Sequence, residues 1–266
     1  MVDEIRLHYL EVSESINDEN VPPVILIPGI TSPAITWQFV GEALARYTRI
    51  FILDNRGRGL SSGGRGIGYS LSDYVGDLVG LIEQLDLKKP ILLGHSMGGR
   101  IALKCAAERP DLLGKIIVAD PPVSGPGRKP YPIPLQWYLD GIDRLSRGEM
   151  EDTSSPILKN WSKEQLQLRS EWLPTCDKDA IMGSYASFHE EDIHSLFSEI
   201  YCPTLLVYAE NGNTVAQEDA SKFVEKIHDC KAVRIDGVGH MMPWDDLDTF
   251  IKITACFLKD QESNKK

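Results

Sequence analysis

The stretch Gly94-His95-Ser96-Met97-Gly98 decides the fold class of this 266-residue chain. It fits the pattern G-x-S-x-G, in which a serine lies on a sharp turn between a strand and a helix. The apolar run Ile91–Leu93 precedes the motif and a helical pattern begins near Met97, which is the context that the turn requires. The two glycines leave room for neighbouring backbone, and the helix N-terminus favours developing negative charge beside the serine. The sequence therefore predicts that Ser96 is a nucleophile.

Short apolar runs on both sides of this motif alternate with helical patterns, which indicates a mainly parallel sheet covered by helices. The runs are continuously apolar, as strands buried on both faces should be. They cover residues 24–27, 50–53, 91–93, 115–119, 204–208 and 232–235. Helical spacing covers Leu71–Leu85, with Ser72 as its N-cap, and residues 97–109, 217–228 and 246–258. We expect an α/β-hydrolase fold whose mainly parallel sheet has eight strands flanked by helices.

The middle of the chain breaks this alternation. It opens with a segment rich in proline and glycine, residues 121–134, and continues with helical patterns that carry three tryptophans. No strand pattern appears before Thr204. We therefore expect residues 1–120 and 202–266 to form the core domain, and residues 121–201 to form a helical cap inserted over its mouth.

Composition narrows the classes of function. The net charge of −11 argues against nucleic-acid binding, because phosphate contacts need clustered Lys and Arg. Five scattered cysteines without a C-x-x-C pair fit a reducing compartment and predict neither a disulfide framework nor a zinc site. The acidic N-terminus has no apolar signal core, and no apolar run approaches the ~18 residues of a membrane span. We expect a cytoplasmic protein that acts on a small molecule, with no metal, other cofactor, nucleic acid or membrane involved.

A serine nucleophile needs a base, and His240 is the best candidate among the six histidines. It lies in a glycine-flanked loop, Gly237–Trp244, after the last apolar run. From there its ring can reach a serine at the carboxyl edge of the sheet. The other histidines have simpler interpretations: strand or surface for His8 and His228, a ring directed away from the serine for His95, and helix surface for His189 and His194.

The acid of the triad has two candidates. In most enzymes of this fold it follows the next-to-last strand, but here Gly212 or Asn213 fills the usual position, and neither can carry a negative charge. Asp120 ends the strand after the nucleophile strand, and adjacent strands lie only ~4.8 Å apart, so its carboxylate can reach the same histidine. Asp120 is preferred, since the acid must hold the imidazole tautomer and stabilise its positive form. Glu210 remains the alternative.

Two backbone amides are expected to form an oxyanion hole. One belongs to Met97, directly after the nucleophile, and the other to Ile30, in the loop after the apolar run 24–27. The segment Asp54–Ser62 resembles the D-x-R-G-x-G-x-S turn of this fold. Its aspartate and arginines are therefore expected to be structural.

Several longer stretches make the chain resemble the N-formylmaleamate deformylase family of nicotinate degradation, whose members are α/β-hydrolases. These stretches are Ile27–Trp37, Arg56–Ser62, Asp120–Arg128, Glu171–Cys176, Phe188–His194 and Gly239–Asp248. The resemblance implies hydrolysis of N-formylmaleamate to maleamate and formate. Matched by motif, it also implies the triad Ser96, Asp120 and His240. A hydrolase of vitamin B6 degradation and cofactor-free ring-cleaving dioxygenases of this fold also use an early acid, so its position does not decide the reaction.

The implied substrate carries a carboxylate while the protein is acidic, so a cation near the pocket is expected. Arg128 in the insertion and Arg100 on the helix after the nucleophile are the candidates, and Trp161 and His189 are candidates for lining the pocket. Three other functions stay open. They are an esterase or amidase for another small carboxylic acid derivative, such as an acetamidomethylene-succinate-type compound, a cofactor-free ring-cleaving dioxygenase, and a non-catalytic binding module.

Overall fold

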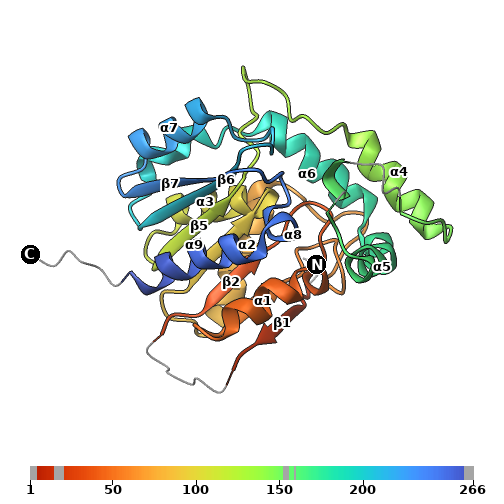
Figure 1. The fold of residues 1–266 in the computed structure, drawn as a ribbon, viewed down its shortest axis with the longest axis horizontal. Coiled ribbons are helices and arrows are strands. Elements are labelled where there is room, and N and C mark those ends of the chain that lie inside the picture. Colours follow the sequence, from red (N-terminus) through yellow and green to blue (C-terminus); the bar gives the residue numbers. More distant parts are fainter. Residues whose placement is uncertain (1–4, 15–20, 152–155, 159, 261–266) are drawn as a thin grey trace, which may run out of the picture.

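One twisted sheet forms the centre of the protein (Figure 1). The computed structural model describes residues 5–14, 21–151, 156–158 and 160–260, and within them the sheet has seven strands in the order β1-β3-β2-β4-β5-β6-β7. Their bounds are β1 Tyr9–Val12, β2 Val24–Ile27, β3 Ile50–Leu53, β4 Ile91–His95, β5 Lys115–Ala119, β6 Thr204–Ala209 and β7 Cys230–Ile235. All neighbouring pairs are parallel except β1 with β3.

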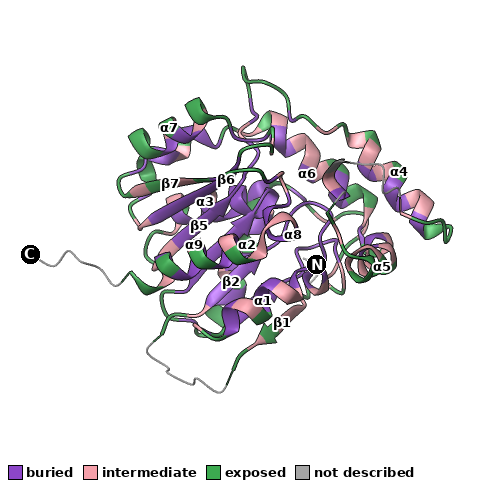
Figure 2. Cartoon of the chain, in the orientation of Figure 1, coloured by how far each residue is buried: buried purple, intermediate pink, exposed green. Residues whose placement is uncertain are grey.

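The α/β fold and the six apolar strands are confirmed, but the expected total of eight strands is not. Strand β1 lies at the edge of the sheet and is partly exposed. It therefore lacks the continuous apolar run by which the buried strands were recognised. Figure 2 shows the same contrast, because the central strands are buried along their length.

Helices cover both faces of the sheet, and alternate residues of each strand define the two faces. Leu26, Ile52 and Val207 pack on one face with α1 (Gln38–Ala45), α8 (Met242–Asp245) and α9 (Leu247–Lys259). Ile25, Phe51 and Leu206 pack on the other with α2 (Leu71–Gln84), α3 (Met97–Glu108) and α7 (Gln217–Lys226). The inner strands β2 and β3 are therefore enclosed on both sides, which explains why their sequences are apolar at every position.

Helix α2 begins at Leu71, as expected, but it ends one residue before the expected range and has a different N-cap. Ser70, in extended conformation, accepts a hydrogen bond from the amide of Asp73 at 3.2 Å, and the Asp73 carboxylate accepts one from the amide of Ser70 at 2.8 Å. This reciprocal pair is a capping box. The prediction of Ser72 as N-cap is wrong because Ser72 lies within the first turn, where its side chain is exposed.

The chain between β5 and β6 contains only helices among its described residues. They are α4 (Leu135–Ser146), α5 (Lys163–Trp172) and α6 (Lys178–Glu190), with short 3-10 turns η2 (Pro156–Leu158), η3 (Leu173–Thr175) and η4 (His194–Glu199). Figure 1 shows α4, α5 and α6 gathered at one end of the sheet. This is the end at which the parallel strands finish, so the segment lies over the carboxyl edge.

Buried polar residues join this cap to the core. Arg58, fully buried, donates to the carbonyl of Ile30 at 2.9 Å and to the hydroxyl of Ser184 on α6, also at 2.9 Å. Asp54, 1% exposed, accepts hydrogen bonds from the amides of Ala34 and Leu60. These residues have the structural roles expected of them, and they hold the loop that follows β2.

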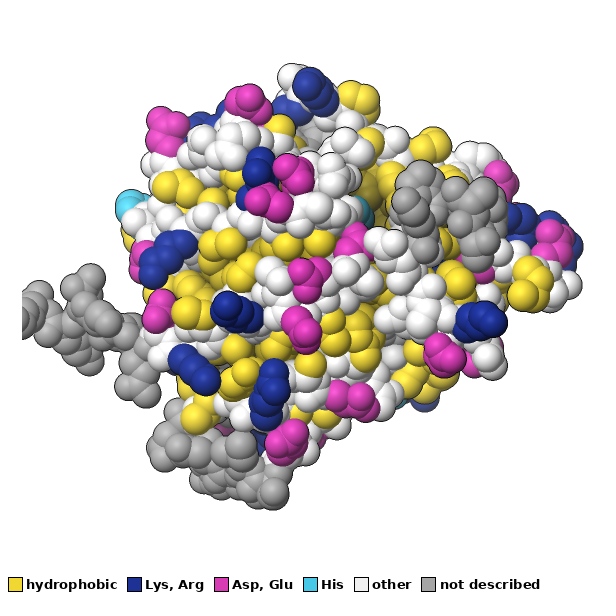
Figure 3. All heavy atoms as spheres, viewed as in Figure 1, with side chains coloured by type: hydrophobic (Ala, Val, Ile, Leu, Met, Phe, Trp, Pro, Cys, Tyr) yellow, Lys and Arg dark blue, Asp and Glu magenta, His cyan; other side chains and the backbone are white. Residues whose placement is uncertain are grey.

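The surface carries charges of both signs. Figure 3 shows acidic and basic side chains interspersed on the visible face, without a basic patch of the kind that binds phosphate backbones. None of the described helices is long and apolar enough to cross a membrane.

Candidate active site

Ser96 lies on the turn between β4 and α3 in a strained conformation, with φ of +52° and ψ of −118°. Positive φ is unusual for a residue with a Cβ atom. The glycines make the turn possible, because a Cβ atom on Gly94 would lie 2.2 Å from the carbonyl oxygen of Gly98. A Cβ atom on Gly98 would lie 1.9 Å from the carbonyl oxygen of Ile27. The turn therefore holds the serine side chain above the carboxyl edge of the sheet.

The structure brings Asp120 to His240. Asp120 directly follows β5 with φ of +45°, is fully buried, and its Oδ2 lies 2.6 Å from His240 Nδ1. Its other oxygen accepts a hydrogen bond from the amide of Ala209 at 3.3 Å. Glu210, the alternative acid, instead accepts from the amide of Gly237 at 2.8 Å and pairs with Arg234. The carboxylate that contacts the imidazole is therefore that of Asp120.

Gly212 explains how the loop after β6 accommodates this carboxylate. A Cβ atom on Gly212 would lie 2.6 Å from Asp120 Oδ2, so any side chain there would overlap the acid. Thr214, two residues later, places its hydroxyl 3.2 Å from His240 Nδ1. The loop that carries the acid in most enzymes of this fold thus leaves space for an acid from the neighbouring strand.

Met97 and Ile30 are the two residues whose amides are expected to form an oxyanion hole. Met97 is the first residue of α3, so its amide has no partner within the helix. Ile30 lines the same pocket as Ser96, and its carbonyl is held by the Arg58 side chain. The oxyanion-hole role of these two amides stays a prediction.

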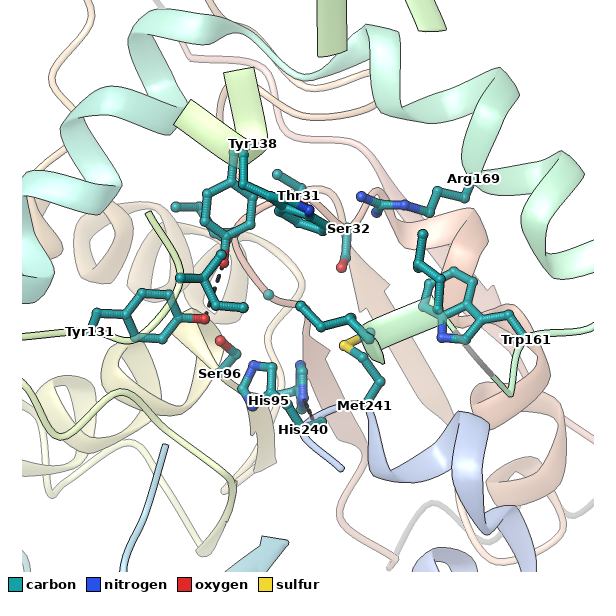
Figure 4. Close-up of a pocket in the computed structure, with 16 residues that line it drawn as sticks. Thr31, Ser32, His95, Ser96, Tyr131, Tyr138, Trp161, Arg169, His240 and Met241 are labelled. Carbon is teal, nitrogen blue, oxygen red and sulfur yellow. Dashed lines mark hydrogen bonds between the residues drawn. The ribbon is translucent and has the colours of Figure 1, made fainter. Parts of the chain in front are cut away.

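A pocket between the cap and the carboxyl edge of the sheet contains Ser96 and His240 (Figure 4). Protein atoms leave about 420 Å³ of space there, open solvent included. The core contributes Gly29, Ile30, Thr31, Ser32, His95, Ser96, His240 and Met241, and the cap contributes Tyr131, Ile133, Trp137, Tyr138, Ile157, Leu158, Trp161 and Arg169. Most of the cap side chains are apolar or aromatic, so the cap shields the site from water.

The structure corrects three of the four proposed substrate-binding residues. Arg100 is fully buried outside the pocket and donates to the carbonyls of the cap, including Pro122 at 3.0 Å and Glu191 at 2.7 Å. Arg128 is partly exposed and lies 3.8 Å from Asp192. His189 binds backbone atoms of the cap. Of the four, only Trp161 lines the pocket.

Arg169 on α5 is the arginine that does line the pocket. It is 7% exposed, its Nε donates to Glu151 at 3.0 Å, and its guanidinium lies 5.8 Å from the ring centres of Trp137 and Trp161. Figure 4 shows it directed toward the pocket. The sequence did not predict this residue, because α5 has a mostly polar sequence without a motif. The one available signal was its position three residues before Trp172, which places both residues on the same side of the helix.

His95 lies inside the site rather than pointing away from it, contrary to expectation. It is 2% exposed, lines the pocket, and its ring centre lies 4.8 Å from that of His240. Its Nε2 donates to the carbonyl oxygen of His240 at 2.9 Å. Burial, with a smaller effect from His240, lowers the pKa of His95 to about 3, so the ring is neutral and holds the His240 backbone. His194, expected on a helix surface, is also buried.

The described residues contain no cluster of His, Cys, Asp or Glu that could hold a metal ion. The chemistry available in the pocket is that of a serine beside an imidazole and a buried carboxylate. A sequence model described as the alpha/beta hydrolase family matches residues 24–253. The chain belongs to the α/β-hydrolase family.

Several known proteins are similar to this hydrolase over most of its length. It is 42% identical over 254 residues to an N-formylmaleamate deformylase of Pseudomonas putida, which covers 96% of this chain and 93% of the relative. The crystal structure of an N-formylmaleamic acid deformylase from a second Pseudomonas putida strain has a TM-score of 0.87 and 38% identity, covering 95% of this chain and 96% of that one. A 2-(acetamidomethylene)succinate hydrolase of Mesorhizobium japonicum is 37% identical over 82% of this chain and 81% of its own length.

The lowered pKa of His95 predicts a pH-dependent stability. The unfolded chain binds a proton at this residue below pH 6.5, whereas the folded protein resists it to about pH 3. Stability from the neutral ring is therefore present above pH 6.5 and decreases as the pH falls. Between pH 7 and pH 5 we expect the free energy of unfolding of the native protein to decrease by about 2 kcal/mol more than that of His95→Asn. Urea unfolding at both pH values measures this, and parallel decreases in the two proteins would refute it.

Gly212→Ala should displace the Asp120 carboxylate, because the added Cβ atom would lie 2.6 Å from its Oδ2. We expect kcat for a small chromogenic ester to fall roughly 10- to 100-fold, since small misplacements of reacting groups are costly. Gly76→Ala is the control, because its Cβ atom meets open space on α2. It should keep kcat and stabilise the protein by about 1 kcal/mol. An unchanged kcat in Gly212→Ala would contradict the account of the site.

Proposed function

We propose that this protein is a serine amidohydrolase that converts N-formylmaleamate and water to maleamate and formate, with Ser96, His240 and Asp120 as its catalytic triad. The observation that carries the catalytic class is the 2.6 Å contact between His240 and a buried Asp120 in a pocket that also contains Ser96. The substrate rests on the 42% identity to an N-formylmaleamate deformylase over 96% of the chain. A pocket whose lining includes an arginine also suits a small acid.

The proposed reaction assigns one role to each residue of the triad. Ser96 Oγ attacks the formyl carbonyl carbon while His240 Nε2 takes its proton, and Asp120 stabilises the imidazolium through Nδ1. The amides of Met97 and Ile30 stabilise the oxyanion. His240 then protonates the leaving nitrogen, which releases maleamate and leaves a formyl ester on Ser96. Water activated by the same histidine hydrolyses this ester and releases formate.

Arg169 is proposed to bind the carboxylate of the substrate. Its Nε is engaged by Glu151, which leaves the outer edge of the guanidinium to face the pocket, as in Figure 4. Guanidinium groups bind carboxylates through paired hydrogen bonds. Trp137 and Trp161 stack near the same group and restrict its position.

A second substrate is favoured by the 37% identity to a 2-(acetamidomethylene)succinate hydrolase. Hydrolysis of an acetamido compound would also cleave an amide bond, but it differs in the acyl group that the pocket must accept. Substrate comparison separates the two.

Formate release from N-formylmaleamate should be rapid in the wild-type protein and lost in Ser96→Ala, because the mutant has no nucleophile. Formate can be measured with a coupled formate dehydrogenase, alongside acetate release from the acetamidomethylene compound and turnover of simple esters. Absence of formate with turnover of another amide or ester would keep the triad and reject the deformylase assignment. Retention of activity in Ser96→Ala would reject the triad.

Arg169→Lys should raise KM for N-formylmaleamate about 10- to 100-fold while kcat changes less, because a charged hydrogen bond contributes about 1.5–3 kcal/mol. KM for an uncharged ester should hardly change. Arg128→Ala is the matched control, since Arg128 is a cap arginine outside the pocket. Equal KM values for the acid in Arg169→Lys and wild type, with the fold intact by thermal unfolding, would place the carboxylate elsewhere.

A further inference from the structure

Tyr131 lies at the active site but has no part in the reaction as derived above. It stands between two prolines in Lys129-Pro130-Tyr131-Pro132, which restrict the backbone on both sides. Its amide donates to His189 Nε2 at 3.2 Å, and its ring packs against Phe188 with centres 5.1 Å apart. His189, whose Nδ1 contacts the carbonyl of Tyr185 at 3.1 Å, therefore fixes the position of Tyr131 from outside the pocket.

The hydroxyl of Tyr131 lies between those of Ser96 and Tyr138. The two tyrosine oxygens are 3.1 Å apart, both residues are 5% exposed, and both line the pocket. Figure 4 shows the Tyr131 hydroxyl directed toward Ser96. Burial raises the pKa of Tyr131 to about 12, and the interactions with the hydroxyls of Tyr138 and Ser96 offset this only in part. Both hydroxyls are therefore protonated at any pH at which a histidine base works.

The direction of these hydrogen bonds matters because His240 must accept the hydrogen of the Ser96 hydroxyl. A hydroxyl has one hydrogen to donate and can accept from others. If Tyr138 donates to Tyr131, the hydrogen of Tyr131 is free for Ser96 Oγ, and the hydrogen of Ser96 is free for His240 Nε2. In the opposite direction Ser96 would donate to Tyr131, and its hydrogen would be turned away from the base.

We propose that Tyr131 is a positioning residue for Ser96: its hydroxyl donates to Ser96 Oγ, and Tyr138 sets the direction of that bond by donating to Tyr131. This rests on the proposed function only in taking Ser96 as the nucleophile, and it applies to any acyl group. The bond restricts rotation of the serine side chain and directs its hydrogen to His240. The prolines and His189 keep the donor in place.

The test is the rate at which Ser96 is labelled by methanesulfonyl fluoride, a small reagent that needs no substrate-binding site. Tyr131→Phe should lower the second-order rate constant about 3- to 10-fold, as expected for loss of one neutral hydrogen bond. KM for substrate should stay unchanged. Tyr138→Phe should lower labelling about 2- to 3-fold on the same grounds. The double variant should match Tyr131→Phe alone, since Tyr138 acts through Tyr131.

Tyr208→Phe is the matched control. It removes another buried tyrosine hydroxyl, bonded to Gln217 at 2.6 Å and outside the pocket, and labelling should stay at the wild-type rate. Thermal unfolding checks each variant, and if Tyr131→Phe does not fold, Tyr138→Phe carries the test.

Labelling of folded Tyr131→Phe at the wild-type rate would overturn the proposal, as would effects of the two substitutions that multiply in the double variant. If Tyr138→Phe carries the test alone, a wild-type labelling rate in that variant would overturn it. If the wild-type protein is labelled at Ser96 but releases no formate from N-formylmaleamate, only the deformylase assignment is rejected.

Discussion

The hydrogen bond between His240 Nδ1 and Asp120 Oδ2 is the contact on which the rest of the site depends. It joins the loop after β7 to the tip of β5, across the end of β6 that lies between them. Two features of the fold make it possible: Asp120 adopts positive φ directly after its strand, and Gly212 has no side chain where one would overlap the carboxylate. His95, neutral beneath the loop, holds the carbonyl of His240.

The cap completes the pocket and is itself held by buried arginines. Arg100 binds carbonyls at both ends of the cap, Ser124 near its start and Glu191 near its end, and Arg58 bonds to α6. Buried guanidinium groups need such partners, because an uncompensated buried charge is strongly destabilising. Arg169 differs from these two, since its charge faces the pocket as well as Glu151. An acidic protein thus presents one positive group where an anionic substrate would bind.

Sequence reasoning reached the fold and the three residues of the proposed triad because each depends on local pattern. The elbow is a short motif between a strand and a helix, and Asp120 and His240 each follow an apolar run. Arg169 and Tyr131 lie in the cap, where long-range packing decides which side chains face the core. Arg100, on the helix behind the nucleophile, shows the opposite error: its position suggested the pocket, but its side chain reaches the cap backbone instead.

The most direct test of the account is the proton NMR signal of His240 Nδ1–H in the wild-type protein, Asp120→Asn and Glu210→Gln. A hydrogen bond to a buried carboxylate deshields this proton strongly. We predict a far-downfield resonance that is present in the wild type and in Glu210→Gln and absent from Asp120→Asn. Persistence of the resonance in Asp120→Asn, or its loss in Glu210→Gln, would contradict the assignment of Asp120 as the acid.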